Sequence, residues 1–148
     1  QFPENHFDVV TLWVVLEHIP YPVTILKEAH RILKPGGLLA VSTPNIESPL
    51  AKILGKRWWE IRRLHVNQFT TKTLTDIVKN ARFKNVSALC YRESISLLYL
   101  LIPILKYLKV YEPLKASFYP DSILGRIMNK IIVVYPSKLN YSTVIAYK

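Results

Sequence analysis

Apolar residues along this chain form two kinds of pattern, short continuous runs and helical stripes, and the two alternate. Phe7 to Val15 is almost continuously apolar and rich in valine. A run without polar alternation predicts a strand that is buried on both faces of a parallel sheet. Leu38 to Ser42 forms a second run of this kind, and it ends at Thr43–Pro44–Asn45.

The residues between these runs have the spacing of an amphipathic helix. Pro22 stands at its start, where proline is favoured, and Lys34 to Gly37 ends it with one proline and two glycines. The apolar face comprises Ile25, Leu26, Ala29, Ile32 and Leu33. Strand, helix and strand within about forty residues predict a right-handed βαβ unit, whose ligands bind beyond the carboxyl ends of the strands.

Similar patterns predict two further strands and one capped helix. Thr70 has the residue type of an N-cap, and the helix after it carries the stripe Leu74, Ile77, Val78 and Ala81. Phe83 to Tyr91 reads as a strand, and "NYSTVIAYK" at the end of the chain reads as another. The chain is therefore predicted to be α/β.

The segment from Ser94 to Val110 is apolar on nearly every face of the helix that it would form. It is too short to span a bilayer comfortably, and it carries Pro103, Lys106 and Lys109. We interpret residues 94–134 as a hydrophobic helical insertion or lid. Its apolar side chains either pack against Ile123 to Val134 or lie at a membrane interface.

Composition narrows the classes of partner. The formal net charge is +10, which favours nucleic acid, a lipid headgroup surface or an acidic substrate. Basic residues cluster only near Trp58–Trp59, and no nucleic-acid-binding module accompanies them, so nucleic acid is the weakest of the three. Cys90 is the single cysteine, which excludes an internal disulfide. The beginning of the chain lacks a signal-peptide pattern, so we expect a cytoplasmic protein or one at the inner membrane surface.

The motifs taken together resemble a known family. "FDVV", "LEHI", the helix before "LKPGG" and "STPN" follow one another between Phe7 and Asn45 as in class I S-adenosylmethionine-dependent methyltransferases. The ubiquinone-type O-methyltransferases and bacterial sugar- or lipid-linked relatives are the most similar branch. The later segment "RWWEIRRLHVNQFT" also resembles this family, although Arg82 stands where the family usually has glycine.

The resemblance implies a Rossmann-like sheet of seven strands, of which this chain supplies the fourth to the seventh, mostly parallel with an antiparallel last strand. A glycine-rich cofactor loop would precede them, and the four glycines here, Gly36, Gly37, Gly55 and Gly125, form no such loop. We therefore expect the C-terminal part of a longer enzyme, inactive by itself. The reaction would be methyl transfer to oxygen or nitrogen of a small-molecule, lipid-linked or sugar-linked acceptor.

The same resemblance indicates the site residues. Trp13 would border S-adenosylmethionine, with backbone from Leu12 and Val14. Glu17 and His18 would stand beside the acceptor, where a carboxylate can orient an imidazole that takes up a proton.

Each of these residues also has an alternative role. Glu17 and His18 could simply turn the chain, and His65 is either an acceptor-positioning residue or a structural one. Trp58 and Trp59 either line the pocket or pack beneath the loop. Related enzymes carry a metal-linked Glu-x-x-Glu-His pattern; with Val14 at the first Glu position two ligands remain, so no metal is predicted. A basic, membrane-surface remnant without catalysis is the alternative function.

Overall fold

The computed structural model describes residues 2–61, 63–96, 101, 104–106, 108–109, 111–118 and 121–148. The chain divides into two compact units. The first, here called the sheet unit, comprises Gln1–Tyr91 and Ser137–Lys148. The second, here called the inserted unit, comprises Arg92–Pro136.

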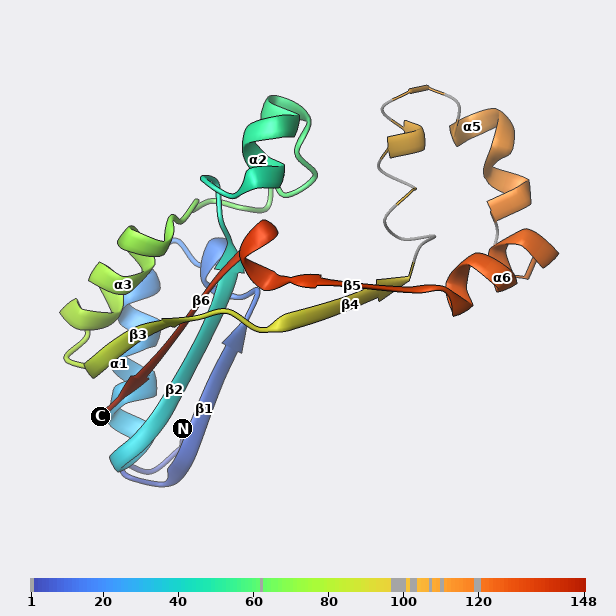
Figure 1. Cartoon of the computed structure of the whole chain (residues 1–148). Helices are drawn as coiled ribbons and strands as arrows, with labels where there is room; N and C mark the ends of the chain where they lie inside the picture. Colours follow the sequence, from blue (N-terminus) through green and yellow to red (C-terminus); the bar gives the residue numbers. More distant parts are fainter. Residues whose placement is uncertain are drawn as a thin grey trace. The chain divides into compact units, whose positions relative to one another are not determined.

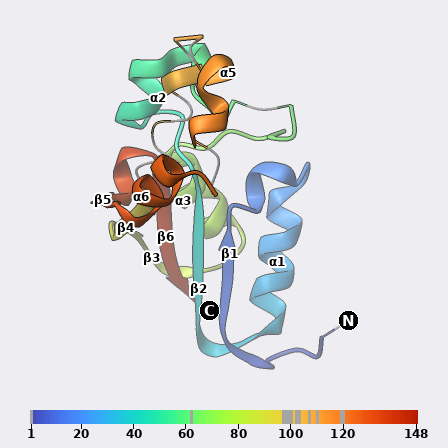
Figure 2. The same ribbon diagram turned by 90° about the vertical axis from the view of Figure 1, so that its right-hand side faces the viewer.

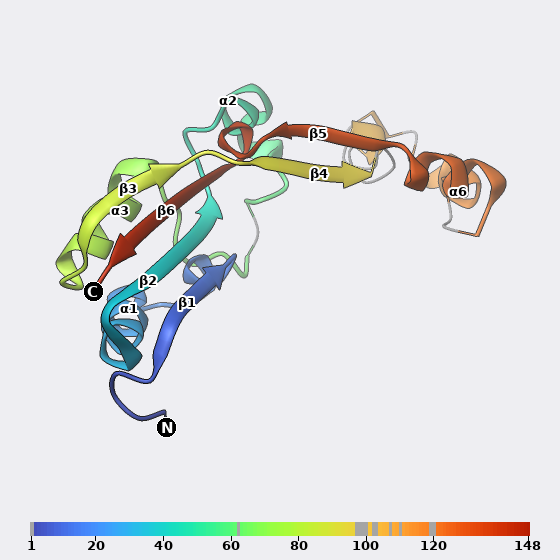
Figure 3. The same ribbon diagram turned by 60° about the horizontal axis from the view of Figure 1, so that its bottom comes forward.

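The sheet unit is built on a four-stranded sheet with the strand order β1-β2-β6-β3 (Figures 1 and 3). β1 and β2 are parallel, while β6 is antiparallel to both of its neighbours. This confirms the predicted parallel pair and the antiparallel last strand. The bounds are β1 (Phe7–Trp13), β2 (Leu33–Pro44), β3 (Lys84–Leu89) and β6 (Tyr141–Tyr147).

Two helices of the sheet unit pack against this sheet. α1 (Pro22–Ile32) begins at the predicted proline and lies beside β1 and β2 (Figure 2). α3 (Thr71–Asn80) begins with a capping box, because the Thr70 side chain accepts a hydrogen bond from the Thr73 amide and the Thr73 side chain accepts one from the Thr70 amide. The N-cap predicted at Thr70 is thus confirmed.

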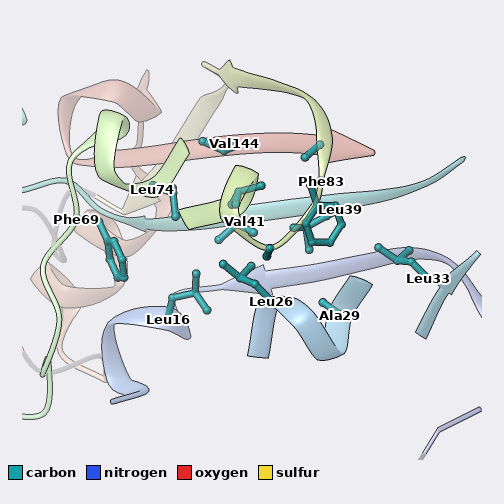
Figure 4. Packing of buried hydrophobic residues seen from close by; sticks show 13 residues of the cluster. Leu16, Leu26, Ala29, Leu33, Leu39, Val41, Phe69, Leu74, Phe83 and Val144 are labelled. Carbon is teal, nitrogen blue, oxygen red and sulfur yellow. The ribbon is translucent and has the colours of Figure 1, made fainter. Parts of the chain in front are cut away.

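The core lies between these helices and one face of the sheet (Figure 4). Leu26 and Ala29 enter it from α1, Leu74 from α3, and Leu39 from β2. Each leucine is fully buried, and full burial of such a side chain stabilises the fold by about 1.5–3 kcal/mol. The predicted packing of α1 on the parallel pair is therefore confirmed.

The prediction that β1 is buried on both faces is wrong. Val9 and Trp13 remain 51% and 47% exposed, whereas Val10 and Leu12 pack against the core. β1 is an edge strand of this sheet, and α1 and α3 contribute to a core on one face of it. The apolar run consequently has one buried and one exposed side in this chain.

β2 begins at Leu33, five residues before the predicted start. The pairing with β1 shifts register between Phe7, opposite Leu33, and Val9, opposite Leu38, so Lys34 to Gly37 form an irregular, bulge-like stretch of β2. A side chain at Gly37 would lie 2.9 Å from both Leu33 Cδ2 and Lys34 O, so glycine is required by close approach.

After α3, Arg82 adopts φ +74°, and its N–H donates a hydrogen bond to Lys79 O (2.9 Å). The turn at Arg82, where the family usually has glycine, therefore has left-handed backbone and is closed by this hydrogen bond.

Short helical elements connect the strands of the sheet unit. A 3₁₀ turn, η1 (Leu16–His18), follows β1. α2 (Pro49–Leu54) and the 3₁₀ turn η2 (Gly55–Arg57) follow β2. Another 3₁₀ turn, η4 (Ser137–Leu139), leads into β6.

The inserted unit contains a two-stranded antiparallel sheet and short helices. Its elements are β4 (Arg92–Ser96), α5 (Tyr111–Leu114), η3 (Lys115–Phe118), α6 (Ile123–Lys130) and β5 (Ile132–Pro136). The helical interpretation of 94–134 needs correction at both ends, since 94–96 and 132–134 are strands that pair with each other. Residues 97–100, 102, 103, 107, 110, 119 and 120 of that segment lie outside the described residues. No helix among the described residues has the length and apolar character to cross a bilayer.

Candidate active site

The carboxyl end of β1 turns sharply at Val14. Val14 has φ +55°, and its N–H donates to Ser42 O (2.9 Å) at the end of β2. A β-branched residue in the left-handed region is strained, at a cost on the order of 1–3 kcal/mol. Trp13 and Val14 are exposed here, while Leu12 packs on the core. The contact of these three residues with the cofactor stays a prediction.

Glu17 is a buried acid with an unusual environment. Its side chain lies in η1 and is 1% exposed, and neither carboxylate oxygen has a hydrogen-bond partner among the described residues. Burial raises the pKa of the Glu17 carboxyl group, while the nearby imidazoles of His18 and His65 act in the opposite direction. A buried carboxylate of this kind favours a positive charge or a proton beside it.

The His18 ring is held in one tautomer. Its Nδ1 lies 3.0 Å from Leu64 O, and because a carbonyl oxygen only accepts, Nδ1 carries the hydrogen. In the neutral ring the lone pair is then on Nε2, which lies 3.9 Å from Glu17 Oε1. The His18 side chain is partly open to solvent, and its Nε2 lies beside the Glu17 carboxylate.

His65 adds a second imidazole to this pair. The ring centroids of His18 and His65 are 4.6 Å apart, with ring planes at 83°. His65 Nδ1 lies 3.9 Å from Glu60 Oε2, and the Tyr141 hydroxyl donates to Glu60 Oε1 (3.3 Å). The sequence interpretation missed Glu60, whose position five residues before His65 is no recognised signal. The structure thus brings Glu17, His18 and His65 together with a second carboxylate.

The loop that carries His65 is fastened at two places. Asn67 N–H donates to Glu17 O (3.1 Å), and the Asn67 side-chain amide donates to Ile19 O.

Trp58 is buried, and its Nε1 donates to Asn140 Oδ1 (2.9 Å), which favours the packing role considered for it. A small cavity of about 10 Å³ remains, with room for about one water molecule. It is lined by Glu17, Pro44, Ile46, Trp58, Glu60, His65, Asn67 and Gln68.

The same residues suit a metal ion in their chemistry. One ligand atom from each of Glu17, His18 and His65 lies within 4.8 Å of the others, and two imidazoles with a carboxylate are ligands for Zn²⁺ or Fe²⁺. The partnerless, buried oxygens of Glu17 fit this role too. The prediction of no metal counted only Glu17 and His18 as possible ligands. The structure places His65 beside them as a third possible ligand.

Comparison with known proteins agrees with the fold. The family described as "Methyltransferase domain" matches residues 1–88 of the 148 residues. A ubiquinone biosynthesis O-methyltransferase of Pseudomonas paraeruginosa is 49% identical over 41 residues, 28% of this chain and 18% of that protein. A demethylmenaquinone methyltransferase of Geobacillus stearothermophilus is 46% identical over 48 residues, 30% of this chain and 20% of that protein.

Solved structures match along nearly the whole chain. A methyltransferase of Thermotoga maritima, described as a possible histamine N-methyltransferase, has a TM-score of 0.61 at 19% identity over 99% of this chain and 58% of its own. One from Archaeoglobus fulgidus has a TM-score of 0.58 at 17% identity over 99% of this chain and 62% of its own. This chain therefore spans less than two thirds of these relatives. It belongs to the class I S-adenosylmethionine-dependent methyltransferases.

Proposed function

We propose that this chain provides the acceptor side of an enzyme that transfers a methyl group from S-adenosylmethionine to an oxygen or nitrogen nucleophile of a small-molecule, lipid-linked or sugar-linked acceptor. The observation that carries the proposal is the Glu17–His18–His65 cluster just after the carboxyl end of β1. In open α/β sheets this is the end at which ligands bind.

His18 is the general base in this proposal. As the lone pair of the acceptor atom forms its bond to the methyl carbon, the acceptor proton moves to His18 Nε2 and the broken C–S bond leaves its electron pair on sulfur. The imidazolium that forms lies beside Glu17, whose buried carboxylate favours that positive charge. S-adenosylmethionine, when bound, supplies the electrophilic methyl group. His65 packs against the His18 ring and helps to hold its orientation.

Residues beyond this chain complete the cofactor site in this proposal. Trp13 and Val14, exposed at the end of β1, form one wall of it, with Leu12 contributing backbone. The chain spans 58% of the Thermotoga maritima relative. We therefore expect no measurable binding of S-adenosylmethionine by this chain alone in calorimetry, and tight binding would contradict this division of the site.

The test of the base uses the longer protein that includes the upstream residues. His18→Gln should lower kcat about 100-fold or more, the usual contribution of a general base. His6→Gln is the matched control, because His6 is an exposed histidine that packs its ring on Phe7 before β1, and it should leave kcat unchanged. An unaltered kcat in His18→Gln would show that proximity alone drives the transfer and that His18 only shapes the turn.

A further inference from the structure

The inserted unit exposes an apolar stripe on α6. Ile123 is 82% exposed and Ile127 is 53% exposed, and Leu124 and Ile131 are exposed beside them. At 100° per residue Ile123, Leu124 and Ile127 fall on one side of α6, with Ile131 at its C-cap, while the buried Gly125 and Met128 fall on another. Within the part of the chain that the structure describes, the helix thus packs with one side and leaves a second apolar side uncovered.

Basic residues border this stripe. Arg126 and Lys130 are exposed, and on the helical wheel both lie next to Ile123, on the side away from Leu124. The inserted unit as a whole contains six Lys or Arg residues against three Asp or Glu residues. An apolar stripe with basic flanks is the feature of a helix that lies in a membrane interface.

We propose that α6 docks the protein on a bilayer surface that contains anionic lipids, with Ile123, Leu124, Ile127 and Ile131 inserted among the acyl chains and with Arg126 and Lys130 at the headgroups. The charge argues for lipid over a second copy of this chain. Two copies joined along this stripe would bring the same cationic side chains together, whereas an anionic surface neutralises them. The eight residues of α6 can lie on a bilayer and are too few to cross it.

Sedimentation with vesicles tests this docking directly. The 148-residue chain should bind vesicles of phosphatidylglycerol and phosphatidylcholine, bind less at high salt, and bind poorly to phosphatidylcholine alone. Ile127→Asp should weaken the binding about ten-fold or more, because it replaces an inserted side chain by a charge. Asn129→Asp is the matched control: it adds the same charge to the same helix, away from the stripe, and should weaken binding much less.

Two outcomes would overturn the proposal. One is the absence of binding to anionic vesicles at low salt, and the other is an equal loss of binding in Ile127→Asp and Asn129→Asp. Circular dichroism checks the fold of each variant, and Ile123→Asp, at the exposed start of the helix, replaces Ile127→Asp if the latter unfolds. A dimer in light scattering that Ile127→Asp converts to monomer, without vesicle binding, would show that a second copy covers the stripe.

This inference does not rest on the proposed methyl transfer, because vesicle binding needs neither cofactor nor acceptor. If the chain binds vesicles and His18→Gln stays active, the docking proposal stands and the proposed base is refuted. If the chain does not bind vesicles and His18→Gln loses activity, the proposed base stands and the docking is refuted. If both hold, a membrane-resident acceptor becomes the first class of substrate to assay.

Discussion

The sheet unit and the inserted unit use their large aliphatic residues in opposite ways. In the sheet unit Leu16, Leu26, Leu39 and Leu74 are completely buried between the helices and the sheet. In the inserted unit Ile123 and most of its apolar neighbours on α6 face outward. Among the described residues, the large buried apolar core therefore belongs to the sheet unit, whereas α6 of the inserted unit exposes apolar side chains.

The strands of the sheet unit are also more extensively paired than those of the inserted unit. β2 pairs on both sides, with seven residue pairs to β6 alone, whereas β4 and β5 pair only with each other over five residue pairs. A two-stranded sheet is marginally stable in water unless something packs on it. The sheet unit therefore carries the larger core, the inserted unit exposes apolar side chains, and three tests address this contrast.

The largest difference is expected between Leu26→Ala and Ile127→Ala. Leu26→Ala removes a fully buried side chain from the centre of the core and should lower the free energy of unfolding by about 2–5 kcal/mol. Ile127→Ala trims an exposed side chain and should change it by at most about 0.5 kcal/mol. Urea unfolding followed by circular dichroism measures both. An equal cost for the two would mean that α6 is part of a core, and the contrast between the units would fail.

The second test concerns the buried acid of the sheet unit. Because burial raises the pKa of Glu17 in the folded protein, the folded state holds its proton to higher pH than the unfolded state, whose value is near 4.5. The free energy of unfolding therefore falls as pH rises from about the unfolded value through the folded one. Glu17→Gln lacks this titration, so its stability relative to wild type should rise by about 1–3 kcal/mol between pH 4 and pH 8.

Urea unfolding at several pH values gives this difference directly. Histidine titrations common to both proteins largely cancel when the two curves are subtracted. A difference that stays constant with pH would mean that Glu17 has found a partner for its charge, such as a bound cation.

The smallest test compares two helix caps. Thr70→Ala removes the capping box of α3 in the sheet unit and should lower the free energy of unfolding by about 1 kcal/mol. Ser122→Ala removes the side chain that accepts a hydrogen bond from Gly125 N–H (2.9 Å) at the start of α6. We expect it to fray α6 with little change in the unfolding of the sheet unit. Amide hydrogen exchange separates local fraying from global unfolding, and a global loss from Ser122→Ala would show that the units unfold together.

Local patterns predicted the elements of the sheet unit because its signals lie close together in the sequence. Pro22 and Thr70 mark the starts of helices through their own chemistry, and the stripe through Leu26 requires only helical spacing. The exposed side of β1 could not be predicted in this way. An apolar run does not report which faces other elements cover, since that depends on residues distant in the chain.

In the candidate site, too, neighbouring residues were predicted and residues brought together from distant parts of the chain were missed. Glu17 and His18 are adjacent, so one motif revealed both, and the resemblance added His65. Glu60 and its partner Tyr141 are 81 residues apart, and no spacing rule connects them. The strands at the ends of the inserted unit escaped prediction for the same reason, because Arg92 pairs with Pro136 across the whole segment.

The position of β6 has a consequence for biosynthesis. β6 lies between β2 and β3, so its residues must enter the middle of the sheet although they are made last among the strands described here. Ser42 and Thr143, whose hydroxyls lie 2.9 Å apart, are separated by 101 residues of translation. At about 5–20 residues per second, β2 waits several seconds on the ribosome with one edge unpaired. Chaperones that bind nascent chains would find this protein most exposed in that interval.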